Sequence, residues 1–235
     1  MKNENILFTS AGDNTSFYKL WCNESRNYDI FVCYYGRDIK NKYEEYSDIY
    51  LKKKGSKMQN FHYAWENNIG NITNYKYYYI VDDDIIIKTD EINELFKLCQ
   101  ELNIWMLQPS FNEDKNSKIS HNITKHIEGN KYRFTNFIEI NTPFFSNYAI
   151  TKCMKKYNPI LIGYGIDILF INILGAEHEN KYVIVDYIYC INPISEIREI
   201  DKLQPEQIRI KNWNIVKKLL KIKDIIIHKN FSIIK

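Results

Sequence analysis

Three consecutive aspartates, Asp82, Asp83 and Asp84, directly follow the most apolar run of the chain, residues 75–81 (YKYYYIV). An uninterrupted run of aromatic and apolar residues is typical of a strand that is buried on both faces of a parallel sheet. Carboxylates at the end of such a strand repel one another and are poorly solvated, so the cluster is costly without a cation or a basic partner. Open α/β folds bind ligands at this carboxyl edge. The pattern therefore predicts a ligand or metal site directly after residue 81.

The spacing within the triplet favours one pair of metal ligands. Alternate residues of a strand point the same way, so Asp82 and Asp84 would share one side while Asp83 points elsewhere. Two carboxylates in this D-x-D arrangement suit Mn²⁺ or Mg²⁺, with positions left for phosphate oxygens and water. The alternative is that the triplet serves the N-terminus of a helix expected from about Glu91, for which Thr89 or Asp90 would be the N-cap.

The remaining sequence alternates short apolar runs with helical patterns, which indicates β-α-β units and a largely parallel sheet. Further strands are expected at residues 5–10, 28–34, 48–51, 105–109, 133–145 and 182–189. Helices are expected up to about residue 21 and at 56–68, 91–102, 149–157 and 166–174. Residues 111–130 are polar and unpatterned, so we expect a loop over the site. A chain of 235 residues without a repeat or a linker fits one α/β domain.

Composition excludes several classes of protein. The net charge of +3 at pH 7 is too small to indicate nucleic-acid binding. The five cysteines are odd in number and form no C-x-x-C pair, which predicts free thiols in a reducing compartment. No signal peptide and no apolar stretch of about 18 residues is recognised, so we expect a cytoplasmic protein.

The basic residues gather near the C-terminus, where residues 202–235 contain nine Lys or Arg against two Asp or Glu. Residues 204–223 predict a basic amphipathic helix, because lysines interleave with Ile208, Val216, Leu219, Leu220 and Ile222. Such a helix would either contact an anionic membrane or pack on the domain with its lysines in solvent. We expect residues 201–235 to be a helical extension packed on a domain formed by residues 1–200.

Several segments, taken together and in order, resemble one family. They are YYYIVDDDIIIKTDEINELFKLC, MLQPSF, SHNIT, RFTNFIEINTPFFS, GYGIDILF and YVIVDYIYCINP, with ILFTSAGDN, YDIFVCYYG and KKKGSKMQN near the N-terminus. This set resembles the family labelled domain of unknown function seven-zero-seven, which is regarded as a family of glycosyltransferases of GT-A fold. The resemblance runs roughly from Asn5 to Pro193. It implies a Rossmann-like single domain with a mostly parallel central sheet flanked by helices, and the transfer of a sugar from a UDP- or GDP-linked donor to a hydroxyl of a glycan or glycolipid.

The resemblance assigns roles at the donor side. Asp82 and Asp84 match the motif for the metal and the diphosphate, and Asp83 would reach the ribose. The loop of Ser10, Gly12 and Asp13, after the first strand, would lie beside the nucleotide base.

A second donor-side candidate lies before a predicted helix. Lys54, Gly55 and Lys57 resemble the Gly-Lys segment of related transferases, in which a Gly lets the backbone approach a phosphate and a Lys adds positive charge. The alternative is a solvated basic turn.

The acceptor side rests on Gly163, Tyr164, Gly165 and Asp167, in a segment that resembles the family's Gly-Trp-Gly-Leu-Asp. Asp167 would accept the proton of an acceptor hydroxyl, which gives inversion at the anomeric carbon. If Asp167 only binds the acceptor, a retaining route is the alternative, and the structural alternative is an ordinary helix N-cap.

Residues 135–139 alternate polar and apolar, which would place Asn136 on one face of a strand and Glu139 on the other. Both are candidates for contact with the sugar or the acceptor, or else they are buried structural groups.

One position departs from the GT-A pattern. Many GT-A enzymes supply a late His as a further metal ligand, whereas this chain has Asn192, in Ile191-Asn192-Pro193. An Asn oxygen suits Mn²⁺ less well than an imidazole does. His228 would substitute only if the tail folds back.

Two other functions compete. A metal-dependent nucleotidyltransferase would need a Gly-rich triphosphate loop near the first strand, but residues 10–14 contain only Gly12. A non-catalytic module that binds nucleotide sugars or carbohydrate would tolerate the loss of Asp167. The presence of the complete triplet and of Asp167 argues against such a module.

Overall fold

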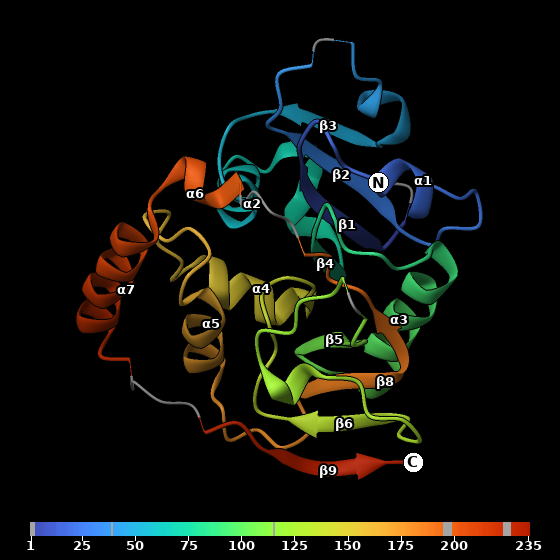
Figure 1. Cartoon of the computed structure of the whole chain (residues 1–235), viewed down its shortest axis with the longest axis vertical. Coiled ribbons are helices and arrows are strands. Elements are labelled where there is room, and N and C mark those ends of the chain that lie inside the picture. Colours follow the sequence, from blue (N-terminus) through green and yellow to red (C-terminus); the bar gives the residue numbers. More distant parts are fainter. Residues whose placement is uncertain (1–2, 39, 115, 195–198, 223–226) are drawn as a thin grey trace.

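A nine-stranded mixed sheet lies at the centre of the described chain, in the order β3-β2-β1-β4-β7-β5-β8-β6-β9 (Figure 1). This computed structural model describes residues 3–38, 40–114, 116–194, 199–222 and 227–235. The strands are β1 (Asn5–Ala11), β2 (Asp29–Tyr34), β3 (Ile49–Lys52), β4 (Tyr77–Asp82), β5 (Met106–Phe111), β6 (Tyr132–Thr135), β7 (Phe144–Ser146), β8 (Tyr182–Cys190) and β9 (Asn230–Ile234). The helices are α1 (Phe17–Leu20), α2 (Lys57–Glu66), α3 (Thr89–Leu102), α4 (Asn147–Met154), α5 (Ile166–Leu174), α6 (Glu199–Leu203) and α7 (Glu206–Leu220), with short 3₁₀ turns at Tyr43–Tyr46, Ile69–Asn74 and Asn122–Thr124.

The sheet is parallel only in part. β1 pairs in parallel with β2 and β4, β2 pairs with β3, and β5 pairs with β8. Because β7 is antiparallel to both β4 and β5, all six of these strands present their carboxyl ends at one edge. β7 lies antiparallel between β4 and β5, and β6 lies antiparallel between β8 and β9. The α/β class is therefore confirmed, but the sheet is mixed, because β6 and β7 run antiparallel to their neighbours where parallel strands were expected. Apolar runs signal a strand without encoding its direction, which is why this was missed.

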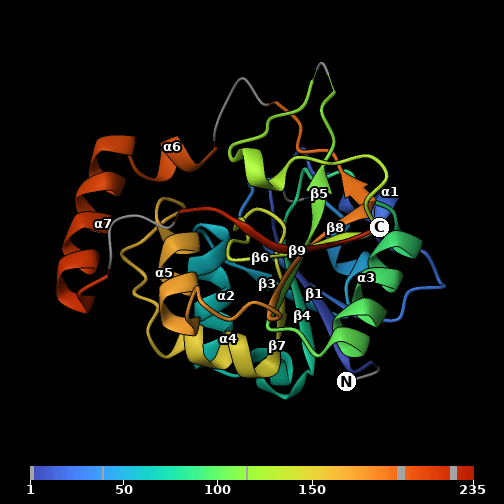
Figure 2. The same cartoon turned by 90° about the horizontal axis from the view of Figure 1, so that it is seen from below.

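Helices cover both faces of the sheet (Figures 1 and 2). Residues of α2, α4, α5 and α7 share one apolar core with one face of the strands. Residues of α1 and α3 share a second core with the other face. Every residue of β1, β2 and β5 is buried, as expected for strands covered on both sides.

Local signals explain where the main helices begin. Ser56 caps α2, where its side chain accepts from the Gln59 amide and the Gln59 side chain accepts from the Ser56 amide. The expected cap of α3 at Thr89 or Asp90 is wrong, because Lys88 occupies the N-cap position and its amide donates to Glu91 at 2.7 Å. The helix therefore begins two residues earlier than expected.

Two strand predictions differ from the structure. β5 runs past Pro109 to Phe111, with a shift of register against β8 after the proline, which cannot donate to the ladder. The strand expected at 133–145 is two strands, β6 and β7, joined by a segment without strand structure. Asn136 and Glu139 lie in that segment, so the expected alternation of faces, which requires a strand, is wrong there.

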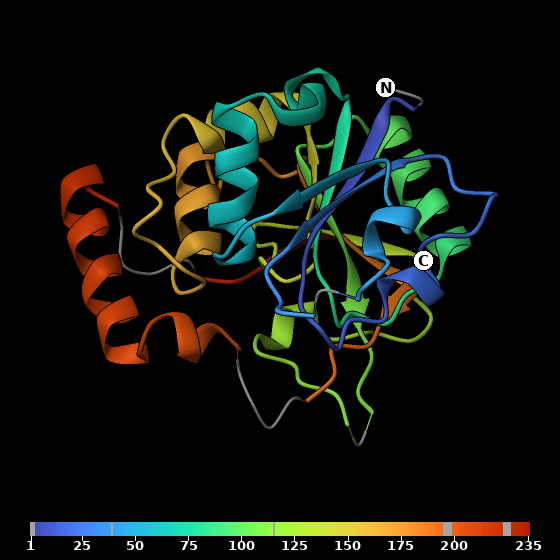
Figure 3. The ribbon, with the colours of Figure 1, turned by 90° about the horizontal axis from the view of Figure 1, so that it is seen from above.

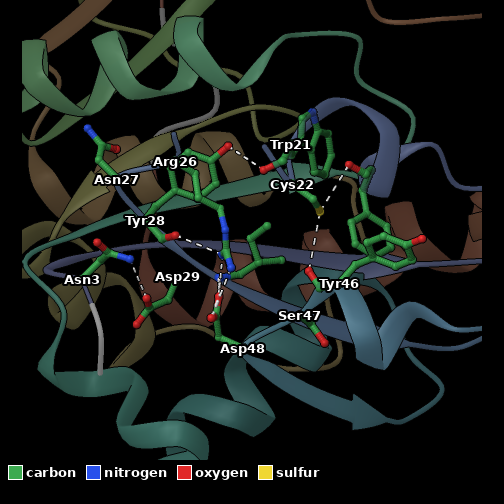
Figure 4. Close-up of polar contacts among 12 residues, drawn as sticks. Asn3, Trp21, Cys22, Arg26, Asn27, Tyr28, Asp29, Tyr46, Ser47 and Asp48 are labelled. Atoms are coloured by element: carbon green, nitrogen blue, oxygen red, sulfur yellow. Dashed lines mark hydrogen bonds and ion pairs between the residues drawn. The ribbon is translucent and has the colours of Figure 1, made fainter. Parts of the chain in front are cut away.

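The opposite edge of the sheet, at the amino end of β2, is tied by a polar network (Figure 4). Asp29 accepts from Asn3 and from the Tyr75 hydroxyl, both at 2.8 Å. Asp48 pairs with Arg26 at 2.5 Å and accepts from the Ile30 amide at 2.8 Å. This network fixes the start of β2 and β3.

The C-terminal region contains more than a helix. α7 buries Trp213 and Val216 in the first core, and it lies at the outer margin of the molecule beyond α5 (Figure 3). β9 then pairs antiparallel with β6 and becomes the edge strand, so the expectation that residues 201–235 are only helical is wrong. All five cysteines are free thiols, as expected. Among the described residues no helix is long and apolar enough to cross a membrane.

Candidate active site

The acidic triplet lies where β4 ends. Asp82 is the last residue of the strand, and Asp83 and Asp84 form a turn in which the Ile85 amide donates to the Asp82 carbonyl at 3.2 Å. The alternation expected for a strand therefore does not govern Asp82 and Asp84. The side chains of Asp82 and Asp83 nonetheless bind groups on different elements of the fold.

Asp83 is bonded to the loop after β1. Its carboxylate accepts from the Gly12 amide at 2.8 Å, and its carbonyl accepts from the Thr15 hydroxyl at 3.0 Å. Burial raises the pKa of Asp83 to about 7, with a further contribution from the charges of Asp84 and Asp82. Gly12 and Asp83, both predicted on the donor side, therefore contact each other directly.

Lys57 is the basic partner of the triplet. Its ammonium group lies 2.8 Å from Asp82 Oδ1, and it also donates to the carbonyls of Ile140 and Asn141 at 2.7 and 2.9 Å. Asp84 is exposed. Burial of the surrounding region and the Asp82 charge raise the pKa of Asp84 to about 6, against the opposing charge of Lys57. The net repulsion between Asp82 and Asp84 means that additional positive charge beside them would be favourable.

The donor set fits a divalent cation only with help from a ligand. Within the described ranges no group of three or more His, Cys, Asp or Glu side chains lies close enough to hold a metal. Asp82 and Asp84 supply two hard oxygen ligands, and diphosphate oxygens and water would complete the shell. Asn192 is buried, and its backbone carbonyl accepts from the Lys118 amide at 2.8 Å. The preceding residue, Ile191, forms an isolated antiparallel β-bridge with Ile86.

A second acidic group lies across from the triplet. Glu139 is buried, where it accepts from Thr124 at 3.3 Å and from Asn141 at 2.8 Å. Burial raises the pKa of Glu139 to about 7, and the charges of Asp167 and Asp82 act in the same direction. The charges that raise the pKa of Glu139 thus come from the end of β4 and from α5.

Asp167 lies in the first turn of α5, with its side chain only 13% exposed. Its carboxylate accepts from the Ile168 amide at 2.9 Å, and burial raises its pKa above the ordinary value. The N-cap of α5 is Gly165, so the alternative that Asp167 caps the helix is wrong. His121 Nε2 lies 3.8 Å from Asp167 Oδ2.

The glycines before α5 are required by their backbone and by their neighbours. Gly163 and Gly165 have φ of +80° and +81°, in the left-handed region that favours glycine. A Cβ on Gly165 would lie 2.4 Å from the Trp213 ring, and one on Gly163 would lie 2.5 Å from Ile200. Tyr164 between them is exposed. α6 and α7 thus pack directly on the turn that positions Asp167.

Two predicted site residues, Ser10 and Asp13, make hydrogen bonds within the fold. Ser10 is buried and accepts from Asn60 at 3.0 Å. The Asp13 carboxylate accepts from the Tyr34 hydroxyl and from the Arg37 and Asp38 amides, and the Tyr34 hydrogen bond is the main reason that its pKa is lowered.

Two further candidates lie apart from the triplet. Lys54 is exposed and lines a hollow of about 370 Å³ on the outside of α2, together with Lys53, His62 and Tyr63. Gly55 adjoins that turn, and a Cβ on it would lie 2.4 Å from Asn60 Oδ1. Of the Lys54–Lys57 segment, therefore, only Lys57 reaches the triplet.

Sequence reasoning missed Tyr35 and His121. The Tyr35 hydroxyl lies 2.7 Å from where a Gly12 Cβ would be, and its pKa is raised by burial and by the charges of the triplet and Glu199. The signal was present: Tyr35 follows β2, whose carboxyl end adjoins that of β1. His121 belongs to the SHNIT segment, whose place over Asp167 depends on the fold of the 111–130 loop.

Glu139 gives a pH dependence that can be measured. Because its folded pKa of about 7 lies above the ordinary value of 4.5, its contribution is fully present below about pH 4.5 and is lost as the pH rises through 7. We expect Glu139→Gln to gain on the order of 3 kcal/mol of unfolding free energy relative to wild type between pH 4.5 and 8. Urea titrations across this range test it, with exposed Glu113→Gln as the control. A difference that does not change with pH would contradict the assignment.

The sheet and the helices on its two faces define a three-layer α/β protein, with a cluster of aspartates at the carboxyl end of β4. No protein-family model matches the chain, and no curated protein matches its sequence. Among solved structures, residues 1–349 of S. aureus TarS in complex with UDP-GlcNAc match with a TM-score of 0.61 and 10% identity, over 96% of this chain and 68% of that one. The complex of TarS 1–349 with UDP matches with a TM-score of 0.53 and 9% identity, over 93% and 72%.

A longer TarS structure matches with a TM-score of 0.57 and 10% identity, over 94% of this chain, which spans only 43% of that structure. At such identities the similarity shows a shared fold alone. The TarS complexes contain a nucleotide sugar and its nucleotide. Membership of the family expected from the sequence stays a prediction.

Proposed function

We propose that this chain is a GT-A glycosyltransferase that moves a sugar from a nucleotide-sugar donor to a hydroxyl of a glycan or glycolipid. The observation that carries the proposal is the acidic edge itself. There the triplet after β4 contacts the Gly12 loop, and Lys57 joins Asp82 to Asn141, which donates to Glu139. A fold shared with TarS, which has been solved with UDP-GlcNAc, supports a UDP-linked donor.

On the donor side, Asp82 and Asp84 would hold Mn²⁺ or Mg²⁺, with Asn192 as the further candidate ligand. When bound, the cation supplies positive charge to the leaving diphosphate. Lys57 adds a fixed positive charge beside Asp82. Asp83 fixes the Gly12 loop through the 2.8 Å hydrogen bond, and the exposed part of Tyr35 offers a ring for stacking with the base.

On the acceptor side, Asp167 is the catalytic base. A carboxyl whose pKa is raised by burial is a better proton acceptor than a fully solvated one. As the acceptor oxygen attacks the anomeric carbon, its proton passes to Asp167 and the bond to the diphosphate oxygen breaks. Direct attack of this kind inverts the anomeric centre. Tyr164, exposed beside the Asp167 turn, is a candidate surface for the acceptor sugar.

Two competing functions make different predictions. A nucleotidyltransferase would release pyrophosphate from nucleoside triphosphates, and a binding module would retain ligand without turnover. Incubation with UDP- and GDP-sugars and Mn²⁺ or Mg²⁺, followed by assay of released nucleoside diphosphate, separates the three. Release that stops on chelation of the metal supports the proposal, and pyrophosphate release or binding without turnover contradicts it.

The proposal includes contact between α7 and an anionic membrane, from the cytoplasmic side. α7 uses Trp213 and Val216 for the core, yet Ile208, Ile215 and Leu219 stay exposed, Leu219 by 71%. These three lie within about 40° of one another around the helix. Lys211 and Lys218 are exposed along one side of that stripe. An apolar stripe edged by lysines suits anionic headgroups.

Vesicle flotation tests this contact. We expect Leu219→Asp to weaken binding to anionic vesicles by about tenfold, because a buried leucine contributes roughly 1.5–3 kcal/mol. Ile210→Asp, on roughly the opposite side of α7, is the matched control. The membrane contact would be ruled out if the wild-type protein does not float with the vesicles. It would also be ruled out if sedimentation shows that a second copy of the chain binds the stripe.

A further inference from the structure

The C-terminal segment returns to the candidate active site. β9 pairs with β6 from Tyr132↔Ile234 to Thr135↔Asn230, which brings the chain beside the segment that carries Glu139. Asn136 then holds the residues on either side of His228. Its amide nitrogen donates to the Ile227 carbonyl at 2.8 Å, and its amide oxygen accepts from the Lys229 amide at 2.9 Å. These two hydrogen bonds, which we call the Asn136 bracket, fix the backbone of His228. They use the Asn136 side-chain amide, which was a candidate for contact with a sugar.

The bracket places the His228 ring in an aromatic group beside Asp167. The ring lies 4.2 Å from Phe137 and 5.4 Å from His121, between centroids. His121 lies 4.7 Å from Phe137, and its Nε2 is 3.8 Å from Asp167 Oδ2. Phe137 is buried, and both imidazole rings pack against its ring.

Exposure increases along this row. Asp167 is 13% exposed, His121 is 34% exposed, and His228 is exposed. The row thus leads from a buried carboxylate to solvent, with groups from α5, from the 111–130 loop and from the C-terminal segment.

A buried catalytic base needs such an outlet. Once Asp167 has taken the acceptor proton it is a neutral acid, and its raised pKa slows loss of that proton. Glu139, the other carboxyl coupled to Asp167, is itself buried and gives no exit. Burial lowers the pKa of both His121 and His228, so their rings are neutral near pH 7 and free to accept a proton.

Resting on the proposed function, we propose that His121 and His228 conduct the acceptor proton from Asp167 to solvent, and that β9 folds back on the sheet to supply His228. The proton leaves the Asp167 carboxyl oxygen for His121 Nε2, directly or through one water that spans the 3.8 Å. The resulting imidazolium passes a proton to His228 or to water, and Asp167 returns to the carboxylate. His121 and His228 are positioning and relay residues, and of these three side chains only Asp167 touches the substrate.

The test compares sugar transfer by wild type, His228→Gln, His121→Gln and Lys229→Gln. Lys229 follows His228 in sequence, and it contacts Asn136 only through its backbone amide. Replacement of its side chain is therefore the matched control. We expect about a tenfold fall in kcat for each histidine variant. Donor KM should not change, the solvent deuterium isotope effect should increase, and added imidazole should restore the rate.

The outcomes separate the inference from the proposed function. A wild type that transfers no sugar from any donor removes the proposed function. An active wild type with a His228→Gln variant of equal kcat and equal isotope effect overturns the relay.

Histidine titration by NMR gives a readout that does not need turnover. We expect the His121 pKa to fall in Asp167→Asn and to rise in His228→Gln, because each change removes a neighbouring charge or dipole. Rings that titrate independently of Asp167 and of each other would overturn the relay as well.

Discussion

Replacement of Asp167 by Asn is expected to lower kcat for sugar transfer by a factor of about 10²–10⁴, which is the usual contribution of a positioned general base. The amide keeps the shape of the carboxyl and still accepts from the Ile168 amide, so α5 should begin as before. Because Asp167 lies on the acceptor side, donor binding should change little. Initial rates with saturating donor, together with a donor melting-temperature shift, measure both effects.

The same variant separates the two stereochemical routes. If Asp167→Asn transfers sugar with the wild-type kcat but a higher KM for the acceptor, Asp167 only binds the acceptor. The base assignment and the inverting route would then both be wrong.

The buried pair of Arg133 and Asp186 gives the largest expected effect on stability. The two side chains are 1% and 0% exposed, and the guanidinium donates to Asp186 at 2.7 and 3.0 Å. It also donates to the Ile123 and Lys125 carbonyls at 2.9 Å, which holds the 111–130 loop against β6. Arg133→Met leaves Asp186 buried without its partner, and we expect a loss of about 3–5 kcal/mol in unfolding free energy.

Urea denaturation of three variants tests this account of the pair. Arg133→Met with Asp186→Leu should recover most of the loss, because no unpaired charge remains buried. Arg26→Met breaks the half-buried pair with Asp48 and should cost only about 1 kcal/mol. Equal losses in Arg133→Met and Arg26→Met would contradict the burial argument.

Local patterns in the sequence predicted much of the sheet and most helices. The apolar run before the triplet is β4, and the helix expected at 166–174 is α5, because its glycines and its apolar periodicity are both local signals. The mixed direction of the strands and the return of β9 could not be predicted in this way. Both depend on pairing between residues far apart in the chain, which leaves no local pattern.

The candidate site shows the same division. The triplet was found because three carboxylates after a buried strand are costly wherever they lie. No local pattern in the sequence indicated the hydrogen-bond partner of each polar residue. Asp13 accepts from the loop after β2, and Asn136 donates to the C-terminal segment. The pairing of Lys57 with Asp82 was not predicted, and contact of Lys57 with phosphate stays a prediction. His121 and His228 join Asp167 only through the folded loop and the returning tail.

One measurement tests the central claim most directly: the melting temperature of wild type and Asp84→Ala, with UDP- and GDP-sugars and Mn²⁺ or Mg²⁺. A donor at 100 times its Kd stabilises the folded state by about 2.7 kcal/mol, or roughly 5–10 °C for a chain of this size. We expect one nucleotide sugar to give such a shift only with the metal, and expect the shift to vanish in Asp84→Ala but not in Asp90→Ala, the exposed aspartate at the start of α3. If no nucleotide sugar shifts the wild type with either metal, the glycosyltransferase proposal is wrong.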